Sequence, residues 1–580
     1  MRLLRAAALL ALAAASSIDD LAAQTRLAST ARVAARADSG RVLRGARAAQ
    51  AAFERVRYRN LPWTSDGGAS GGGCDERIGR FCLWHDDTDL DWTPPPEPEA
   101  VRRGRAELIA TLDEGAAAFP GDGWIAGQRV RYLAEAGRAA DAVRAARACR
   151  AERWWCAALE GYALHFARDY TAAASAFAAA IAAMPPATRR EWENLEPALV
   201  HGDARALARM EPSARAATLR RLWWLADPFW MDAGNDRLTD HYARLVADGF
   251  QDRARNTEGI SWANDLREIL VRWGQPTGWE RIRPRMGQTP DGGMITHYGA
   301  SFEFIPTLAM VRDPFAVRAA DWKTDQKGAH SVYSPPGVRR LAALPHQAAV
   351  FRRGEMAEVV AAFAMKPDSL AASPVLEAGA VLMRDADAPP VAHTERVAGT
   401  RGVFRLRAEP AQAVLSIEAR EPVSQRAARA RFGVDLRQPA ARAIAISDVL
   451  LLDRADARPQ SLDEAAPLAR GSTEFSPGDR IALYWEVYGL NAADSLTFSV
   501  ALARRPPGAA RRAVESIGLA RGVTPVRMRW IEEAAATEVL ARSLAIALPR
   551  VPPGTYALEV AVRSRTGAIA TTIRDITVTR

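Results

Sequence analysis

The sequence predicts a multidomain α+β protein with a helical-repeat N-terminal region, a small α+β central module and two C-terminal β-sandwich modules. Three observations lead to this fold class. The chain has 580 residues, enough for about three to five domains, and its 48% hydrophobic and 25% charged residues are ordinary for globular proteins. Apolar residues recur with helical spacing from Val101 to about Arg220. Short alternating segments between proline and glycine turns dominate after Leu341.

The N-terminus has the features of a secretory signal peptide. Arg2 and Arg5 form a basic start, Ala6–Ala15 is an apolar run too short to span a bilayer, and small residues before Ser16 and Gln24 offer cleavage points. No later stretch approaches about 18 uninterrupted apolar residues, so we expect no transmembrane helix. The protein is therefore expected to be exported, to the periplasm or to the cell exterior.

From these patterns we divide the chain into six parts. They are a signal peptide at 1–23, a helical segment and Gly/Pro-rich linker at 24–100, helical repeats at 101–220, the central module at 221–320, and β-sandwiches at 341–436 and 437–580.

The net charge of +9 does not by itself indicate a nucleic-acid partner. Lysine occurs only at Lys323, Lys327 and Lys366, and the remaining basic residues are arginines in an alanine-rich chain, which is typical of a GC-rich coding bias. Neither a G-x-x-x-x-G-K-[ST] loop nor a G-x-G-x-x-G fingerprint is present. We expect no nucleic-acid partner and no cofactor.

The four cysteines form two close pairs, Cys74 with Cys82 and Cys149 with Cys156. An even count in an exported protein predicts disulfides, and the spacings of eight and seven residues suit local bridges. A four-cysteine zinc site is the alternative, but neither pair has the C-x2-C spacing of structural zinc sites. We predict disulfides and no metal, and spacing leaves pairing between the two segments open.

Two segments of the linker could be read as sites. Gly68–Gly72 satisfies the G-x-S-x-G pattern, but that nucleophile needs a strained turn between a strand and a helix, which neither flank supplies. The acidic run His85–Asp91 could attract calcium, yet it lacks the central glycine and the distal glutamate of an EF-hand loop. With Pro94–Pro96 after it, we interpret it as a solvated connector.

The region 101–220 looks like a tetratricopeptide helix array. The segments beginning at Gly137 and Arg168 align at a spacing of 31, close to the repeat period of about 34 residues. In the second unit, Gly161 and Phe177 fall where that repeat places a small residue and a large apolar one. Such an array presents a concave surface for a peptide or protein, or it supports the next domain. Cys149 and Cys156 lie across the turn between the two units.

The central module is expected to combine a helix with strands. Asn235–Phe250 carries one apolar stripe at helical spacing. In Leu266–Trp273, Ile269, Val271 and Trp273 alternate on one face, which predicts a strand stopped by Gly274 and Pro276. Tyr298–Ile305 is a second candidate strand.

Tryptophans crowd around two acidic turns of this module, in WWLADPFW from Trp223 and in SWANDLREILVRWGQP from Ser261. This arrangement resembles the GWxTD domain of exported bacterial proteins, a family without a known function. The residues that carry the resemblance are Trp224, Asp227, Pro228, Trp262, Asn264, Asp265, Gly274 and Pro276. Ser261 stands where the motif has glycine and Asn264 where it has threonine, so the motif is divergent.

The motif residues are expected to be structural. Asn264 and Asp265 are residues that set turns, and the indole of Trp262 offers a large apolar face with one donor. The alternative is an acid/base pair of Asp265 with Asp240, His241 or Glu268, which would need these groups to meet. We therefore name no catalytic residue, and the tryptophans either pack in the core or form a platform for sugar rings.

The C-terminal half predicts strands in two series. The clearest candidates are Glu358–Phe363, Gly379–Met383, Val403–Leu406, Val414–Ile417, Ile481–Tyr488 and Tyr556–Val562. The last module is similar to the immunoglobulin-like tails that accompany GWxTD domains. Glu486 lies between aromatic residues, where it is either a ligand contact or an outward-facing residue of an alternating strand.

The sequence thus favours an exported, non-catalytic protein that binds a protein or peptide, or acts as a scaffold, in the cell envelope. Two alternatives remain open. One is a glycan-binding protein that uses surface tryptophans, and the other is a hydrolase whose carboxylates meet in the central module.

Overall fold

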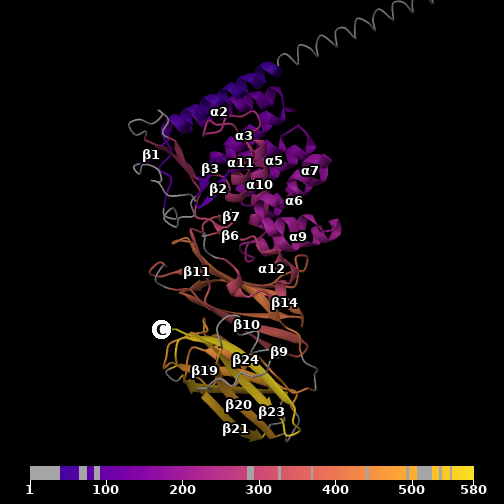
Figure 1. Ribbon diagram of the computed structural model, residues 1–580, viewed down its shortest axis with the longest axis vertical. Helices are drawn as coiled ribbons and strands as arrows, with labels where there is room; N and C mark the ends of the chain where they lie inside the picture. Colours follow the sequence, from indigo (N-terminus) through magenta and orange to yellow (C-terminus); the bar gives the residue numbers. More distant parts are fainter. Residues whose placement is uncertain are drawn as a thin grey trace, which may run out of the picture. The chain divides into compact units, whose positions relative to one another are not determined.

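The computed structural model describes residues 39–64, 75–83, 92–283, 293–323, 328–366, 370–438, 443–490, 495–505, 526–533, 538–548 and 551–579. The predicted signal peptide 1–23, the Gly68–Gly72 tract, Cys74 and the acidic run 85–91 lie outside these residues. The described chain mixes helix and sheet, with helices toward the N-terminus and sheets toward the C-terminus (Figure 1).

The chain divides into two compact units. The first contains the described residues up to 198 together with 238–298, and the second contains 199–237 and the residues from 299 onward. The predicted central module 221–320 is therefore divided between the two units.

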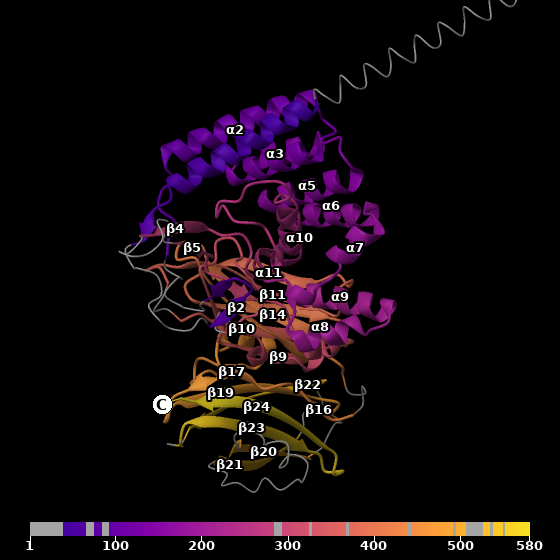
Figure 2. The ribbon, with the colours of Figure 1, turned by 45° about the horizontal axis from the view of Figure 1, so that its top comes forward.

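Helices form most of the first unit. They are a helix over 39–59, α2 (Glu99–Ala118), α3 (Gly123–Glu135), α4 (Ala139–Arg147), α5 (Arg153–Phe166), α6 (Tyr170–Ala183), α7 (Pro186–Trp192), η2 (Glu196–Ala198), α10 (Asp236–Gly249, of which this unit contains the part from Leu238) and α11 (Asn264–Trp273). The helix over 39–59 packs along α2, where Phe53 meets the backbone at Gly104, and the two helices lie side by side in both views (Figure 2).

Two turns of the first unit repeat the same geometry at the predicted spacing. Gly137 ends α3 and Arg168 ends α5, and both have a left-handed backbone, with φ of 71° and 62°. The next amide closes each turn in the same way: Arg138 N donates to Leu133 O at 2.9 Å, and Asp169 N donates to Leu164 O at 3.0 Å. Both pairs of helices therefore turn through the same C-terminal capping motif.

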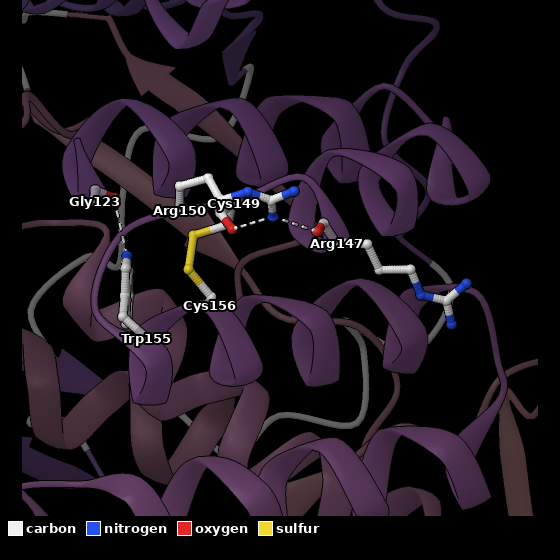
Figure 3. Close-up of a disulfide and its surroundings, with 6 residues drawn as sticks. All are labelled: Gly123, Arg147, Cys149, Arg150, Trp155 and Cys156. Atoms are coloured by element: carbon white, nitrogen blue, oxygen red, sulfur yellow. Dashed lines mark hydrogen bonds between the residues drawn. A yellow bond between two sulfur atoms is a disulfide. The ribbon is translucent and has the colours of Figure 1, made fainter. Parts of the chain in front are cut away.

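One of the predicted disulfides is present. Cys149 and Cys156 are bonded, and they join the end of α4 to the first turn of α5 (Figure 3). Beside the bond, the Trp155 indole donates to Gly123 O at 2.9 Å and so ties the start of α5 to the start of α3. Cys82, the other described cysteine, lies half-buried in β3 and accepts a hydrogen bond from Arg77 Nη2 at 3.4 Å.

Short strands complete the first unit. They are β1 (Trp63–Thr64), β2 (Glu76–Ile78), β3 (Phe81–Leu83), β4 (Gly278–Ile282) and β5 (Met294–His297). β4 lies between β1 and β5, parallel to the first and antiparallel to the second, while β2 and β3 form a hairpin.

The strand predicted at Leu266–Trp273 is wrong, because the segment is helix α11. Leu266, Ile269 and Leu270 are buried at helical spacing, so the apolar stripe that packs inward has a period of 3.6 rather than 2. The helix Asn235–Phe250 is confirmed as α10, whereas Tyr298–Ile305 contributes only the two-residue β6.

The second unit begins with two helices and a set of short elements. These are α8 (His201–Ala208), α9 (Pro212–Ala226), β6 (Phe302–Glu303), α12 (Leu308–Arg312), η3 (Pro314–Ala316), η4 (Ala319–Asp321) and β7 (Val332–Tyr333). The amide of Leu308 donates to Asp203 at 2.9 Å, which ties α12 to α8.

Two sheets then share one core. One has the order β13-β10-β9 and the other β12-β11-β14-β15-β8, and Val359, Phe404 and Leu415 are among the core residues that both contribute. The strands are β8 (Arg340–Ala343), β9 (His346–Arg353), β10 (Met356–Ala364), β11 (Val375–Met383), β12 (Val391–Ala398), β13 (Arg401–Ala408), β14 (Gln412–Glu421) and β15 (Arg426–Asp435).

A second pair of sheets follows in the same way. One contains β16, β17 and β22 around β19, the other has the order β18-β24-β23-β20-β21, and Trp485, Phe498 and Val560 lie in the core between them. The elements are β16 (Ala445–Ile446), β17 (Leu450–Leu452), α13 (Leu462–Ala465), η6 (Ala466–Leu468), β18 (Glu474–Phe475), β19 (Arg480–Tyr488), β20 (Ser495–Arg504), β21 (Val526–Glu533), β22 (Val539–Ala547), β23 (Gly554–Arg563) and β24 (Ile569–Val578).

β10 and β19 are buried on both faces because a further apolar cluster lies between the two pairs of sheets. Glu486 belongs to that inner face: it is 2% exposed, accepts hydrogen bonds from the hydroxyls of Tyr484 and Tyr488 at 2.7 Å, and pairs with Arg353. The outward-facing interpretation of Glu486 is therefore wrong, and the residue is a buried partner of Arg353. No helix in the described part of the chain is long and apolar enough to cross a membrane.

The contact between α5 and α6 generates a stability prediction. A Cβ added at Gly161 would lie 2.7 Å from the ring of the fully buried Phe177, so Gly161→Ala should lower the free energy of unfolding by about 1–3 kcal/mol. Urea unfolding followed by circular dichroism measures this.

Gly45→Ala is the matched control, because Gly45 lies in the helix over 39–59 with open space around it. It should leave stability unchanged or raise it by up to about 1 kcal/mol. Equal effects of the two variants would contradict the close helix packing.

Candidate functional site

The first unit contains a cavity of about 360 Å³, which is the candidate site. Its wall is built from the helix over 39–59, α2, α3, α5, α10, α11, the segment after α11, and the segment that precedes α2. The lining groups used below are charged (Arg57, Arg105, Arg131, Glu97, Glu135, Glu258) or aromatic (Trp92, Tyr162, Phe250, Trp262, Trp279, Tyr298).

A buried ion-pair cluster forms the polar wall. The carboxylate of Glu135, from the last turn of α3, receives Arg57 from the helix over 39–59 and Arg131 Nε at 2.8 Å. Behind them the fully buried Glu54 accepts from Tyr132 Oη at 2.6 Å and from Thr257 Oγ1 at 3.0 Å. Since α3 is helical, Arg131 and Glu135 share one face and meet at the i, i+4 spacing.

These contacts fix the ionisation of Glu135. Burial alone would raise the pKa of the carboxyl group, but the charges of Arg57 and Arg131 lower its pKa to about 2. Arg131 still has capacity to donate: its Nη1 is buried and has no hydrogen-bond partner among the described residues. The same holds for Nε of Arg105, whose other nitrogens pair with Glu97.

Aromatic rings form a further part of the lining next to the arginines, since the Arg57 guanidinium lies 5.9 Å from the centroid of the Trp279 ring. Trp279, half-buried in β4, donates from its indole to Glu258 at 2.8 Å. Burial raises the pKa of the Glu258 carboxyl group, and the hydrogen bond from Trp279 offsets only part of that rise. Trp262 turns its indole nitrogen away to Asp248, at 2.8 Å, and leaves its ring between the core and the cavity.

Three of the predicted motif residues line the cavity, namely Trp262, Gly274 and Pro276. Gly274 ends α11 with φ of 88°, a conformation that favours glycine, and a Cβ there would approach Arg244 to 3.1 Å. Arg244 caps the helix by donating to Val271 O at 2.9 Å. The segment Gly274–Pro276 therefore leaves α11 directly into the cavity wall.

Asp265 acts as an anchor outside the cavity lining. It lies in the first turn of α11, where its carboxylate accepts from Leu266 N at 2.8 Å and receives Arg80 Nε at 2.6 Å and Nη2 at 2.9 Å. The hydrogen bond from Arg80 lowers the pKa of Asp265. Arg80 belongs to the turn between β2 and β3, so the pair holds that hairpin against α11, while Asn264 is exposed beside it.

The remaining motif residues, Trp224, Asp227 and Pro228, lie in the second unit. The Trp224 and Trp230 rings stack with centroids 5.3 Å apart, and the carbonyl of Asp227 accepts from Arg431 Nη1 at 2.7 Å. Arg431 in turn pairs with Glu418 of β14 at 3.0 Å, both fully buried.

The side chain of Asp227 lies in the same buried region. Burial raises its pKa well above the usual value, and Asp236 raises it further. This part of the motif seats the Asp-Pro turn on the sheet of β14 and β15.

Three of the four groups considered for an acid/base pair form ion pairs with arginines, and the fourth, His241, is buried in α10. Asp240 pairs with Arg244 at 2.7 Å, Glu268 pairs with Arg272 at 3.1 Å, and Asp265 pairs with Arg80. Among the described residues, no group of three or more His, Cys, Asp or Glu side chains is arranged to hold a metal ion.

The sequence analysis missed the residues that make this site. Arg57 and Arg131 lie on helices whose patterns indicated only a packed array, and the proline run before α2 was interpreted as a connector. One signal was available: Trp279 follows the Gly274–Pro276 stop so closely that it had to lie near the end of α11.

Comparison with known proteins adds no assignment. No family model matches the chain, and no curated protein matches it. Among solved structures, red sea bream transglutaminase is similar over 42% of this chain and 32% of its own length, with 9% identity and a TM-score of 0.15. A similarity of that size carries no argument about fold or activity, and this chain spans about a third of that protein's length.

Breaking the buried ion pair between Glu418 and Arg431 in the second unit should lower the stability of the protein strongly. Glu418→Gln leaves Arg431 buried without its counter-charge, and it leaves a single acceptor oxygen for the two amides of Trp230 and Met231, which each use a separate oxygen of Glu418. We expect a loss of about 3–5 kcal/mol in the free energy of unfolding. The control Glu409→Gln breaks an exposed pair with Arg384 and should cost about 1 kcal/mol or less. Similar losses in both variants would contradict the assigned role of Glu418.

The anchor at Asp265 predicts a pH dependence. Because its pKa is lowered in the folded state, its contribution is complete above the unfolded value of about 3.9 and is lost as the pH falls through the folded value. Asp265→Asn should therefore be less stable than the wild type at neutral pH, with the difference vanishing in acid. Denaturant titrations across this range measure it, with the exposed Asp252→Asn as control. A difference that persists at low pH would exclude the carboxylate as its source.

Proposed function

We propose that this chain is an exported, non-catalytic protein of the GWxTD-like class that binds a peptide segment of a protein partner in the cell envelope. The observation that carries the proposal is the cavity of about 360 Å³ against the helical region, whose lining combines aromatic rings with arginine side chains. Pockets of this kind, mostly apolar with a few polar groups, are typical ligand sites.

The state of the carboxylates supports binding rather than catalysis. Hydrolysis by a carboxylate pair needs one group that holds a proton and another that is free to accept one. Glu258, with its raised pKa, fits the first role. Glu135 is held between Arg57 and Arg131, and Glu97 is held by Arg105, so neither is placed to serve as the base.

The same proposal includes the finer architecture. We assign α3–α6 to tetratricopeptide-like hairpins, supported by the matching turns at Gly137 and Arg168. We assign the two pairs of sheets to immunoglobulin-like β-sandwiches, supported by the antiparallel strands that face each other across a shared core. Export rests on the basic and apolar N-terminal sequence.

A glycan ligand is the second candidate, because Trp92 and Trp279 both line the cavity and indole faces stack on sugar rings. The two candidates differ in the ligand of the cavity. The peptide-binding protein would bind a segment of another protein, and the glycan-binding protein would bind a cell-wall polymer.

Site-specific photocrosslinking in the native envelope tests the proposal. A photoreactive amino acid at Thr277, which is exposed and lines the cavity, should capture a protein, whereas one at the exposed Asp252 should not. Trp279→Leu should reduce the capture about tenfold, the effect of losing an aromatic anchor at an interface.

Trp154→Leu is the control, since Trp154 is also half-buried but lies outside the cavity lining. Capture that is insensitive to Trp279 would remove the cavity from the proposal. Capture of polysaccharide alone would establish the glycan candidate instead.

A further inference from the structure

The segment Trp92–Pro98 lies along the rim of the cavity and is extended by its own chemistry. Each proline fixes its φ near −65° and pushes the residue before it to extended backbone, and this applies throughout Thr93–Pro98. Pro98 itself has φ of −60° and ψ of 143°, the values of a polyproline II helix. We call this segment the strap.

The strap contacts the cavity with the period of a polyproline II helix. Trp92, Pro94, Pro95, Glu97 and Pro98 line the cavity, whereas Thr93 and Pro96 do not. A helix with three residues per turn has three edges, and here two edges contribute to the cavity lining while the third, with Thr93 and Pro96, does not. The strap therefore docks on its surface as a ligand of that conformation would.

Both ends of the strap are fastened by side chains. The Trp92 ring stacks on His297 with centroids 3.8 Å apart and 9° between the planes, and it fills the space that a Cβ on Gly278 would need. At the other end Glu97 forms two hydrogen bonds with the guanidinium group of Arg105, one of them at 3.0 Å. The prolines between these two points are exposed.

The surface under the strap offers what such a segment requires. Backbone carbonyls of a polyproline II helix have no internal partners, and proline rings pack on aromatic side chains. The cavity supplies aromatic rings, among them Trp279 and Tyr298, and buried arginine donors that lack partners among the described residues, Nη1 of Arg131 and Nε of Arg105.

We propose that the strap is an internal ligand, and that the partner is a proline-rich peptide with an acidic residue that displaces it. This inference rests on the proposed peptide-binding function and names the class of peptide. The strap is covalently attached, so it competes at an effective concentration on the order of millimolar, and a free peptide binds weakly while the strap is in place.

The test uses the strap sequence as the probe. A labelled acetyl-WTPPPEPEA-amide peptide is titrated into the full-length protein and into the double variant Trp92→Ala/Glu97→Ala, with binding followed by fluorescence anisotropy. The variant should bind the peptide about tenfold or more tightly than the wild type, because its own strap no longer competes. Pro96→Ala, on the edge that does not line the cavity, should behave as the wild type.

Two further measurements test which features of the peptide the site recognises, its prolines and its acidic side chain. A peptide with glycine in place of every proline should bind the double variant about tenfold more weakly, since it must lose more conformational freedom. Replacing the peptide glutamate that corresponds to Glu97 by glutamine should weaken binding in the double variant but make no difference once Arg105→Gln is added. If the double variant does not fold, Glu97→Gln alone should show the same direction with a smaller gain.

Equal binding of the proline and glycine peptides, or no gain on releasing the strap, would overturn the inference. Neither result affects the photocrosslinking test: protein capture at Thr277 that depends on Trp279 would still support peptide binding, with a different class of peptide.

Discussion

The buried ion-pair cluster between the helix over 39–59 and α3 is the constraint on which the candidate site depends. Arg57 and Arg131 share Glu135, and Glu54 lies behind them without exposure to solvent. A buried charge that loses its partner is strongly destabilising, so moving any one of these side chains out of the cluster would lower the stability of the fold. The cluster therefore holds the first helix, α3 and the loop at Thr257 in one arrangement, and that arrangement forms the polar wall of the cavity.

The tryptophan-rich motif segments fix the ends of helices at two separate places, one in each unit. In the first unit, Asp265 fastens the β2–β3 hairpin to the start of α11, and Gly274 ends the helix so that the chain continues into the cavity wall. In the second unit, the Asp227-Pro228 turn gives its carbonyls to buried arginines of β15. The short polar residues of the motif thus set the ends of helices, and the indoles fill space beside them.

Much of the architecture followed from the sequence because local patterns determine it. Short runs between prolines and polar turns identified β11, β13 and β14, strict alternation identified β23, and the spacing of Gly137 and Arg168 located two equivalent turns. The spacing of Cys149 and Cys156 predicted their bond. The strand expected at 266–273 failed because Ile269, Val271 and Trp273 alternate by chance, while the stripe that decides burial runs through Leu266, Ile269 and Leu270.

The site itself was much harder to predict. It is assembled by contacts such as Arg57 with Glu135 and Glu54 with Thr257, which join residues 78 and 203 positions apart. No local pattern encodes such pairs, and an arginine on a helix is usually a solvated residue. Glu486 shows the same limit: its alternating strand suggested an outer face, but the first pair of sheets covers that face and Arg353 of β9 neutralises the charge.

The two units are interleaved along the sequence, and this limits how the chain can fold during synthesis and where it can be truncated. The first unit needs residues 238–298 to be complete, and residues 199–237, made before them, belong to the second. A nascent chain that has reached residue 237 still lacks α11 and most of α10, so Tyr162 of α5 and Phe177 of α6 do not yet have the aromatic contacts that Phe250 and Tyr242 provide. A truncation at either end of 221–320 therefore leaves an unfinished core, and this protein is best handled and engineered as a whole chain.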